Sequence, residues 1–177
     1  MLNYSEIMKT LEEQMSTYAA YHQDARNKAT HFIGVPVIVL SLMIPLAWLR
    51  FEGISAAMVV TAVLLAYYLV LDIWLGLAMC LVMGALLWLG QLMADQGALA
   101  GWIWFAVFFV GGWILQLVGH VFEGRKPALA DNLFQIFVAP IFLAAEIAFA
   151  LGLRRDTRRR VEELSRRSAD RVRQTHD

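Results

Sequence analysis

Long runs of apolar residues, each ended by charge or glycine, dominate the chain from Phe32 onward. A bilayer core about 30 Å thick is crossed by a helix of about 20 apolar residues. The charged positions that end or interrupt these runs up to Phe122 are Arg50, Glu52, Asp72 and Asp95. The pattern therefore predicts apolar helical segments at roughly Phe32–Leu49, Ile54–Leu71, Ile73–Met93, Trp102–Val121 and Leu133–Leu153.

The second and third segments form one continuous apolar run that only Asp72 interrupts. A run of that length must fold back on itself, and we expect the bend at Asp72 because a charge at mid-bilayer is costly. Tryptophans stand toward the segment ends, as in an interfacial aromatic belt, at positions Trp48, Trp74, Trp88, Trp102 and Trp104.

A segment richer in polar residues flanks this apolar part on each side. From Asn3 to His22 apolar side chains recur at helical spacing, which predicts an amphipathic helix against the membrane surface or the bundle end, with Asn3 and Glu6 as a cap pair. The tail from Arg154 to Asp177 carries nine arginines, and we expect it to be a solvated helix or partly disordered, near anionic headgroups. The predicted fold is an all-α polytopic transmembrane helix bundle, with a membrane domain over 1–153 and an arginine-rich tail over 154–177.

Composition agrees with a membrane protein. Of 177 residues, 59% are hydrophobic, and the mean hydropathy of +0.57 is too high for an ordinary soluble domain. The single cysteine, Cys80, excludes an intramolecular disulfide and a cysteine-based metal cluster. No signal peptide is expected, because an acidic, helix-like stretch precedes the first apolar run. The lipid bilayer is the expected surrounding, and nucleic acid is not an expected partner.

Basic residues in the short loops predict the orientation. The N-terminal arm carries Lys9, Arg26 and Lys28, and the loop after the fourth segment carries Arg125 and Lys126. The positive-inside rule therefore puts the N-terminus and the 123–131 loop in the cytoplasm, most simply across a bacterial inner membrane.

Five full crossings would export the arginine-rich tail. The last segment also contains Pro140 and Glu146, both awkward in a lipid-exposed span. We therefore expect a re-entrant or bundle-buried segment there and a cytoplasmic tail.

Three of the four histidines converge under this topology. His22 and His31 precede the first span and His120 ends the fourth, so four crossings bring all three to the cytoplasmic face. His176 lies in the tail and is expected to be solvated.

On a straight helix His22 and His31, nine residues apart, would point half a turn away from each other. A break within 23–27 removes that constraint and lets Tyr18/His22 and Asn27/His31 form separate one-turn pairs.

Further polar residues are expected at the same end of the bundle as the histidines. Gln116, His120 and Glu123 are spaced i, i+4, i+7 along one helix face. Beyond Pro127, Asn132 and Gln135 again lie about one turn apart, behind Asp131 as a possible N-cap.

Several neutral imidazoles beside a carboxylate, with positions left open, suit Fe(II) or Zn(II). The alternative is that each histidine is a hydrogen-bonded packing residue at the membrane interface. Spacing alone leaves both interpretations open.

Two separated motifs resemble the membrane 2-hydroxy fatty acid dioxygenase family, known from the fungal endoplasmic reticulum. The first runs Tyr18-Ala-Ala-Tyr-His22-Gln-Asp-Ala-Arg-Asn27-Lys-Ala-Thr-His31-Phe-Ile-Gly34-Val-Pro36. The second runs Trp113-Ile-Leu-Gln116-Leu-Val-Gly-His120-Val-Phe-Glu123 and continues with Lys126-Pro-Ala-Leu129, Asn132, Gln135 and Pro140. The two motifs stand in the family's order, and the match covers roughly Tyr18 to Glu146.

The resemblance implies an Fe(II)-dependent α-oxidation, in which dioxygen cleaves a 2-hydroxy fatty acid to the acid one carbon shorter. It implies His22, His31 and His120 as metal ligands and, with Glu123, as the catalytic set; Glu123 would be a fourth ligand or a support to the ligands. Residues that would position the ligands or the substrate headgroup are Tyr18, Asn27, Gln116, Asn132 and Gln135, and Arg26 or Lys28 could hold the carboxylate.

Three other classes remain as alternatives. A haem-binding bundle is disfavoured because the histidines stand at segment ends rather than paired at depth. An integral diiron desaturase or hydroxylase typically needs more than the four histidines present. A transporter or scaffold, with or without a structural metal, would account for Asp72 and Glu146 as intramembrane charges. Metal content and an electronic spectrum discriminate these classes.

Overall fold

The computed structural model describes residues 10–124 and 134–174, and side chains as far as Arg166. Over those ranges the chain is helical apart from one short hairpin, which confirms the predicted all-α class. The elements are α2 (Leu11–Tyr21), α3 (Ala25–Trp48), β1 (Arg50–Phe51), β2 (Ile54–Ser55), α4 (Ala56–Leu71), α5 (Ile73–Ala94), α6 (Ala98–Glu123), α8 (Gln135–Ala150) and α9 (Arg155–Gln174).

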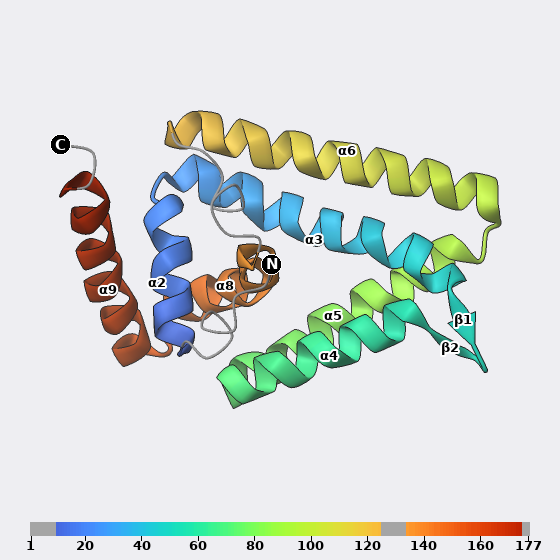
Figure 1. The fold of residues 1–177 in the computed structure, drawn as a ribbon, viewed down its shortest axis with the longest axis horizontal. Helices are drawn as coiled ribbons and strands as arrows, with labels where there is room; N and C mark the ends of the chain where they lie inside the picture. The colour runs from blue at the N-terminus through green and yellow to red at the C-terminus, as the bar shows by residue number, and fades with distance from the viewer. Residues whose placement is uncertain (1–9, 125–133, 175–177) are drawn as a thin grey trace.

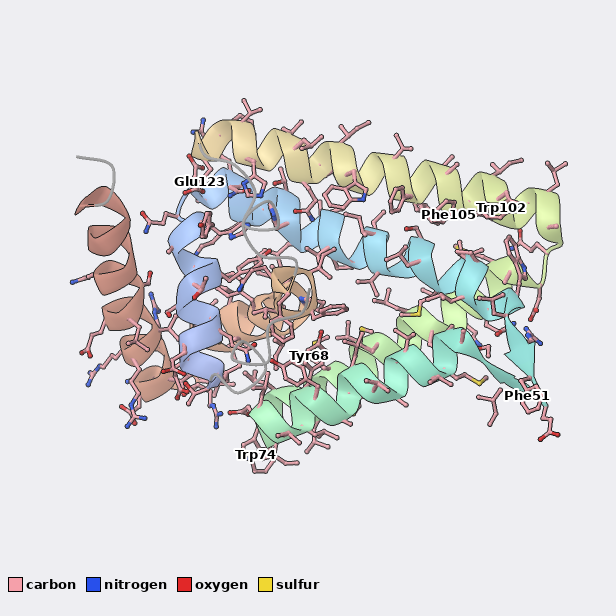
Figure 2. All side chains as sticks on the ribbon, in the orientation of Figure 1. Phe51, Tyr68, Trp74, Trp102, Phe105 and Glu123 are labelled. Atoms are coloured by element: carbon pink, nitrogen blue, oxygen red, sulfur yellow. The ribbon has the colours of Figure 1, made fainter. Side chains whose placement is uncertain are left out.

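Four helices run back and forth along the long axis of the molecule (Figure 1). Of these, α3, α5 and α6 are long and apolar enough to cross a membrane, whereas α4 and α8 are apolar but shorter. The start of α3, the α4–α5 turn and the end of α6 lie toward one end of the bundle, and the β1–β2 hairpin marks the other. In Figure 2, Glu123 and Trp74 stand toward the first end, and Phe51 and Trp102 toward the second.

The closest packing joins α3 to α6 through glycine. A Cβ on Gly34 would lie 2.9 Å from Gln116 Nε2 and 3.1 Å from the Gly112 carbonyl oxygen. A Cβ on Gly112 would lie 2.6 Å from Ile38 Cγ1. Small residues let two membrane helices approach until their backbones touch, so this pair forms a fixed frame for residues at its end.

Asp72 is the bend between α4 and α5, as the apolar pattern predicts. Its carboxylate accepts hydrogen bonds from the backbone N–H groups of Trp74 and Leu75, both at 3.0 Å, and so caps α5. The same carboxylate forms an ion pair with Arg154, the first residue of the tail. The tail therefore starts beside the α4–α5 turn.

Helix α8 does not run alongside the spans; Figure 1 shows it nearly end-on. Its first residue, Gln135, shares a cavity with the histidines, and Glu146 accepts a hydrogen bond from Lys28 at the start of α3 at 2.9 Å. Both ends of α8 thus face the same end of the bundle. The ion pair removes the difficulty of an unpaired carboxylate in an apolar segment.

Helices α2 and α9 close that end. Within the described residues α2 begins at a capping box between Thr10 and Glu13, whereas the predicted pair Asn3/Glu6 lies outside the described residues. The apolar side of α2 faces inward, with Leu11, Met15 and Tyr18 buried, and α9 packs against α2 through Val161 and Ser165. The amphipathic helix therefore lies across the bundle end.

Candidate metal centre

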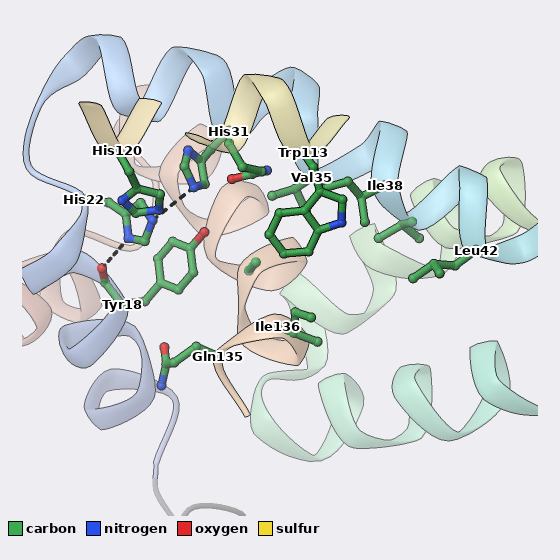
Figure 3. Close-up of a pocket in the computed structure, with 13 residues that line it drawn as sticks. Tyr18, His22, His31, Val35, Ile38, Leu42, Trp113, His120, Gln135 and Ile136 are labelled. Atoms are coloured by element: carbon green, nitrogen blue, oxygen red, sulfur yellow. Dashed lines mark hydrogen bonds between the residues drawn. The ribbon is translucent and has the colours of Figure 1, made fainter. Parts of the chain in front are cut away.

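Three helices bring the three histidines together (Figure 3). His22 is the C-cap residue that follows α2, His31 lies in the second turn of α3, and His120 lies in the last turn of α6. The ring centroids are 4.5 Å apart for His22 and His31, and 5.1 Å for each of the two pairs with His120. A ligand atom from each ring lies within 4.8 Å of the others, and all three side chains are buried.

The predicted break between His22 and His31 makes this possible. Helix α2 stops at Tyr21, and Asp24 caps α3 by accepting a hydrogen bond from the Arg26 N–H at 2.8 Å. The chain turns between the two helices, so the nine-residue spacing no longer sets the two rings on opposite faces.

Backbone carbonyls determine which ring nitrogen carries the proton in His22 and in His31. His22 Nδ1 lies 2.7 Å from the Tyr18 carbonyl oxygen, and His31 Nδ1 lies 2.9 Å from the Asn27 carbonyl oxygen. A carbonyl only accepts, so both Nδ1 atoms must donate, and both Nε2 atoms of the neutral rings keep their lone pairs. Burial lowers the pKa of His22 to about 3, so its ring is neutral at pH 7.

The two Nε2 atoms nevertheless face each other at 3.2 Å, the contact drawn in Figure 3. Two lone pairs cannot hydrogen-bond to each other. Two nitrogens that bind one metal at about 2.1 Å each lie about 3.0–3.4 Å apart when their directions are octahedral or tetrahedral neighbours. His120 Nδ1 is buried with no hydrogen-bond partner among the described residues. The donor set therefore fits a cation bound between the rings better than it fits packing histidines.

Glu123 lies outside this ligand group and clamps the break instead. Its carboxylate accepts hydrogen bonds from the N–H groups of Gln23 and Asp24 at 2.9–3.1 Å, and from Asn27 Nδ2 at 3.0 Å. The end of α6, which carries His120, is thereby tied to the loop between the other two histidines. Of the two roles that sequence left open for Glu123, this geometry favours support of the ligands.

The other predicted residues divide into two groups. Tyr18, Gln116 and Gln135 line the cavity at the histidines; the Tyr18 ring stacks on His22 with centroids 3.9 Å apart, and Gln135 Oε1 is buried without a partner among the described atoms. Asn27 is fully buried behind His31.

Neither of the two basic residues that could hold the substrate carboxylate lines the cavity at the histidines. Arg26 pairs with Asp24 at 2.8 Å and lies over the Phe122 ring, and Lys28 pairs with Glu146. Asn132 and the proposed cap Asp131 lie outside the described residues.

An apolar cavity of about 110 Å³ starts at the three histidines. Four helices line it: α2 contributes Tyr18, α8 contributes Gln135, Ile136 and Ala139, and most of the rest of the wall comes from α3 and α6. A water occupies about 10–15 Å³ on the same measure, so the cavity holds a group larger than one or two waters. Its walls are mainly hydrocarbon, and Tyr18 and Gln116 are polar groups near its histidine end.

Comparison with known proteins identifies the family of this chain. The model of the family described as "2-hydroxy-palmitic acid dioxygenase Mpo1-like" matches residues 8–151. The chain belongs to this family.

A curated member, the 2-hydroxy-palmitic acid dioxygenase MPO1 of Saccharomyces cerevisiae, is 36% identical over 146 residues, which cover 80% of this chain and 82% of the yeast protein. No solved structure matches the chain. The match to this Mpo1-like family includes all three histidines and the helices that carry them.

Two features around the histidines of this Mpo1-like protein were not predicted from its sequence. One is Gly119, whose missing side chain lets α6 approach Asn27 and Thr30. A glycine directly before a histidine on an apolar helix was an available signal. The other is the Glu123 clamp, which no local pattern predicts because its donors lie about 100 positions earlier in the chain.

Proposed function

We propose that this protein is an Fe(II)-dependent dioxygenase of the membrane that converts 2-hydroxy fatty acids to fatty acids one carbon shorter. The observation that supports it most is that the Nε2 atoms of His22 and His31 face each other at 3.2 Å, while a backbone carbonyl accepts a hydrogen bond from each Nδ1. His120 lies beside them, and an apolar cavity leads away from the three rings. The family match and the name of the yeast relative indicate the substrate class.

His22, His31 and His120 would hold the metal. Three imidazoles leave coordination positions free on Fe(II), whose chemistry when bound is to bring dioxygen and the 2-hydroxy acid into reaction. The chain contributes order: the carbonyls of Tyr18 and Asn27 fix the ring tautomers, and Glu123 fixes the loop between them. Such supporting hydrogen bonds typically change metal affinity 10–100-fold.

The cavity suits both ends of the substrate. Tyr18, Gln116 and Gln135 line the cavity and would bind a carboxylate and a hydroxyl, and the apolar walls would hold the chain. Among the described residues, no arginine or lysine lines the cavity. The metal itself would therefore be the main partner of the substrate carboxylate.

The overall reaction needs no external reductant. The bond between carbons 1 and 2 breaks, carbon 2 becomes the new carboxyl group, and carbon 1 leaves as carbon dioxide. One 2-hydroxy acid and one dioxygen give the shortened acid, carbon dioxide and water. The substrate supplies all the electrons that dioxygen takes up, so the reaction requires no bound nucleotide or flavin.

Protein purified without oxygen and loaded with Fe(II) tests the proposal. Given dioxygen, it should convert 2-hydroxyhexadecanoic acid to pentadecanoic acid, detected by mass spectrometry. Hexadecanoic acid should be inert, because a site that binds the hydroxyl discriminates strongly against an analogue without it. A chelator should stop turnover. Folded, iron-loaded protein that leaves every chain length of 2-hydroxy acid unchanged would refute the proposal.

A further inference from the structure

The apolar cavity is an elongated groove that follows one face of α3. From the histidines it passes Val35, Ile38 and Leu42, which are spaced at i, i+3 and i+7 and therefore share a helix face. Figure 3 shows the order plainly: the histidines stand at one end, Trp113 and Ile136 in the middle, and Leu42 at the other end.

Its length corresponds to one leaflet of a bilayer. Leu42 is eleven residues beyond His31, and at about 1.5 Å per residue the groove is about 16 Å long. Half of a hydrocarbon core of about 30 Å is about 15 Å. His31 stands at the start of the apolar part of α3, so the groove runs from the interface to about mid-bilayer. Leu42 is 40% exposed, so the far end reaches the lipid-facing surface.

We propose that this groove takes a single acyl chain sideways from one leaflet, and that it selects substrate by the polar head and not by chain length. The inference rests on the proposed function and adds how the substrate enters and what limits it. A fatty acid in a leaflet already has its carboxylate at the interface and its methyl end near mid-bilayer. It can therefore move into the groove without changing depth.

Lipid surroundings remove the usual preference for longer chains. A methylene in the bilayer is already among hydrocarbon, so transfer into an apolar groove yields little free energy per carbon. Length can then matter only through steric exclusion, and the open end at Leu42 excludes nothing. Tyr18 stacks on His22 and Gln116 lies one turn before His120 on α6, so both polar groups lie at the histidine end, where the two oxygens of the head would lie.

A residue that blocks the groove should impose a length limit that depends on its position. An extended carbon chain advances about 1.2 Å per bond, as in an extended polypeptide, where three bonds span about 3.6 Å. Ile38, about 10 Å along α3 from His31, then corresponds to about nine bonds, and Leu42 to about thirteen. Ile38→Phe should therefore set a lower limit than Leu42→Trp.

The experiment compares product profiles in nanodiscs for 2-hydroxy acids of 10 to 20 carbons supplied at equal amounts. Wild-type protein should turn over the series within about fivefold, because the groove gains little per methylene. Ile38→Phe should lose turnover at least about tenfold above roughly 10–12 carbons while keeping the shortest acids, and Leu42→Trp above roughly 14–16. The matched control is Ile33→Trp, on the lipid-facing side of α3 and 59% exposed, which should keep the wild-type profile.

The outcomes separate the two proposals. An inactive wild type refutes the proposed function. An active wild type whose profile stays the same in Ile38→Phe and Leu42→Trp refutes the groove alone. A wild type that already shows a sharp length optimum refutes selection by the head. Leu42 faces lipid, so Leu42→Trp should fold even if Ile38→Phe disturbs the contact with α6.

Discussion

Gly119 is the position where the smallest change should have the largest effect on the metal centre. It lies directly before His120 on α6, at the point where α6 meets the start of α3. A Cβ there would lie 2.2 Å from Thr30 Oγ1, 2.4 Å from Asn27 Oδ1 and 3.3 Å from His31 Nδ1. The substitution Gly119→Ala therefore inserts a methyl group against two residues behind the predicted ligand His31.

The required displacement can be read from these distances. Ordinary van der Waals contact begins at 3.4 Å, so the first two contacts are each about 1 Å or more too close. Thr30 can rotate its hydroxyl away, but Asn27 is held by its hydrogen bond to Glu123. The end of α6 must then move by roughly 1 Å and carry His120 with it. Metal–ligand distances tolerate only about 0.2 Å, so metal affinity should fall by at least about tenfold.

Overpacking should also destabilise the fold by about 1–3 kcal/mol. Gly111→Ala is the matched control, because a Cβ at Gly111, on the same helix, meets nothing within 4 Å. That change should leave metal affinity unchanged and can raise the stability of the fold by up to about 1 kcal/mol, because alanine has the higher helix propensity.

The assay is a Co(II) titration followed by ligand-field absorption, with circular dichroism to confirm the helices. Adding Thr30→Ala to Gly119→Ala should restore affinity only in part, since the Asn27 contact persists. Wild-type Co(II) affinity in folded Gly119→Ala would refute the reasoning, and so would equal losses in Gly119→Ala and Gly111→Ala.

Three further predictions follow from other contacts. His22→Ala, His31→Ala and His120→Ala should each abolish stoichiometric metal in elemental analysis while leaving the helices intact, whereas His176→Ala should change nothing; retention of metal in all three would contradict the ligand assignment. Asp72→Ala removes the α5 cap and the partner of Arg154, and it should lower the free energy of unfolding in detergent by about 1–3 kcal/mol. The control Asp95→Ala breaks an exposed pair with Arg50 and should cost under about 1 kcal/mol. Equal losses in the two variants would contradict this. Topology reporters should place Glu52 on the outer side and Gly124 on the cytoplasmic side, with a reporter after Arg166 on the side of Gly124; the first two on one side would contradict the four-crossing topology.

The apolar pattern was sufficient to predict the apolar helices of the bundle, but not the β1–β2 hairpin. A bilayer offers no partner for backbone polar groups, so a long apolar run must be a helix wherever it crosses, and this requirement is local in sequence. The bend at Asp72 follows for the same reason, because a carboxylate ends a span by its own solvation energy. With these two rules, His22, His31 and His120 necessarily come to one end, as the structure confirms.

Tertiary packing decided what those rules could not. Glu146 pairs with Lys28, 118 positions earlier in the chain, and α8 lies across the bundle in contact with α2, α3 and α5. Arg26 pairs with Asp24, two residues earlier, and its guanidinium lies over the Phe122 ring of α6, so it does not line the cavity.

The chemistry of the centre also needed the fold. Sequence spacing predicted that Tyr18 and Asn27 pair with His22 and His31 but left metal binding and ordinary packing equally open. In the structure, the hydrogen-bonded Nδ1 atoms and the facing Nε2 atoms favour a group that could bind a metal. Which ring nitrogen is free depends on the acceptor its other nitrogen meets, and that acceptor is positioned only when the helices pack.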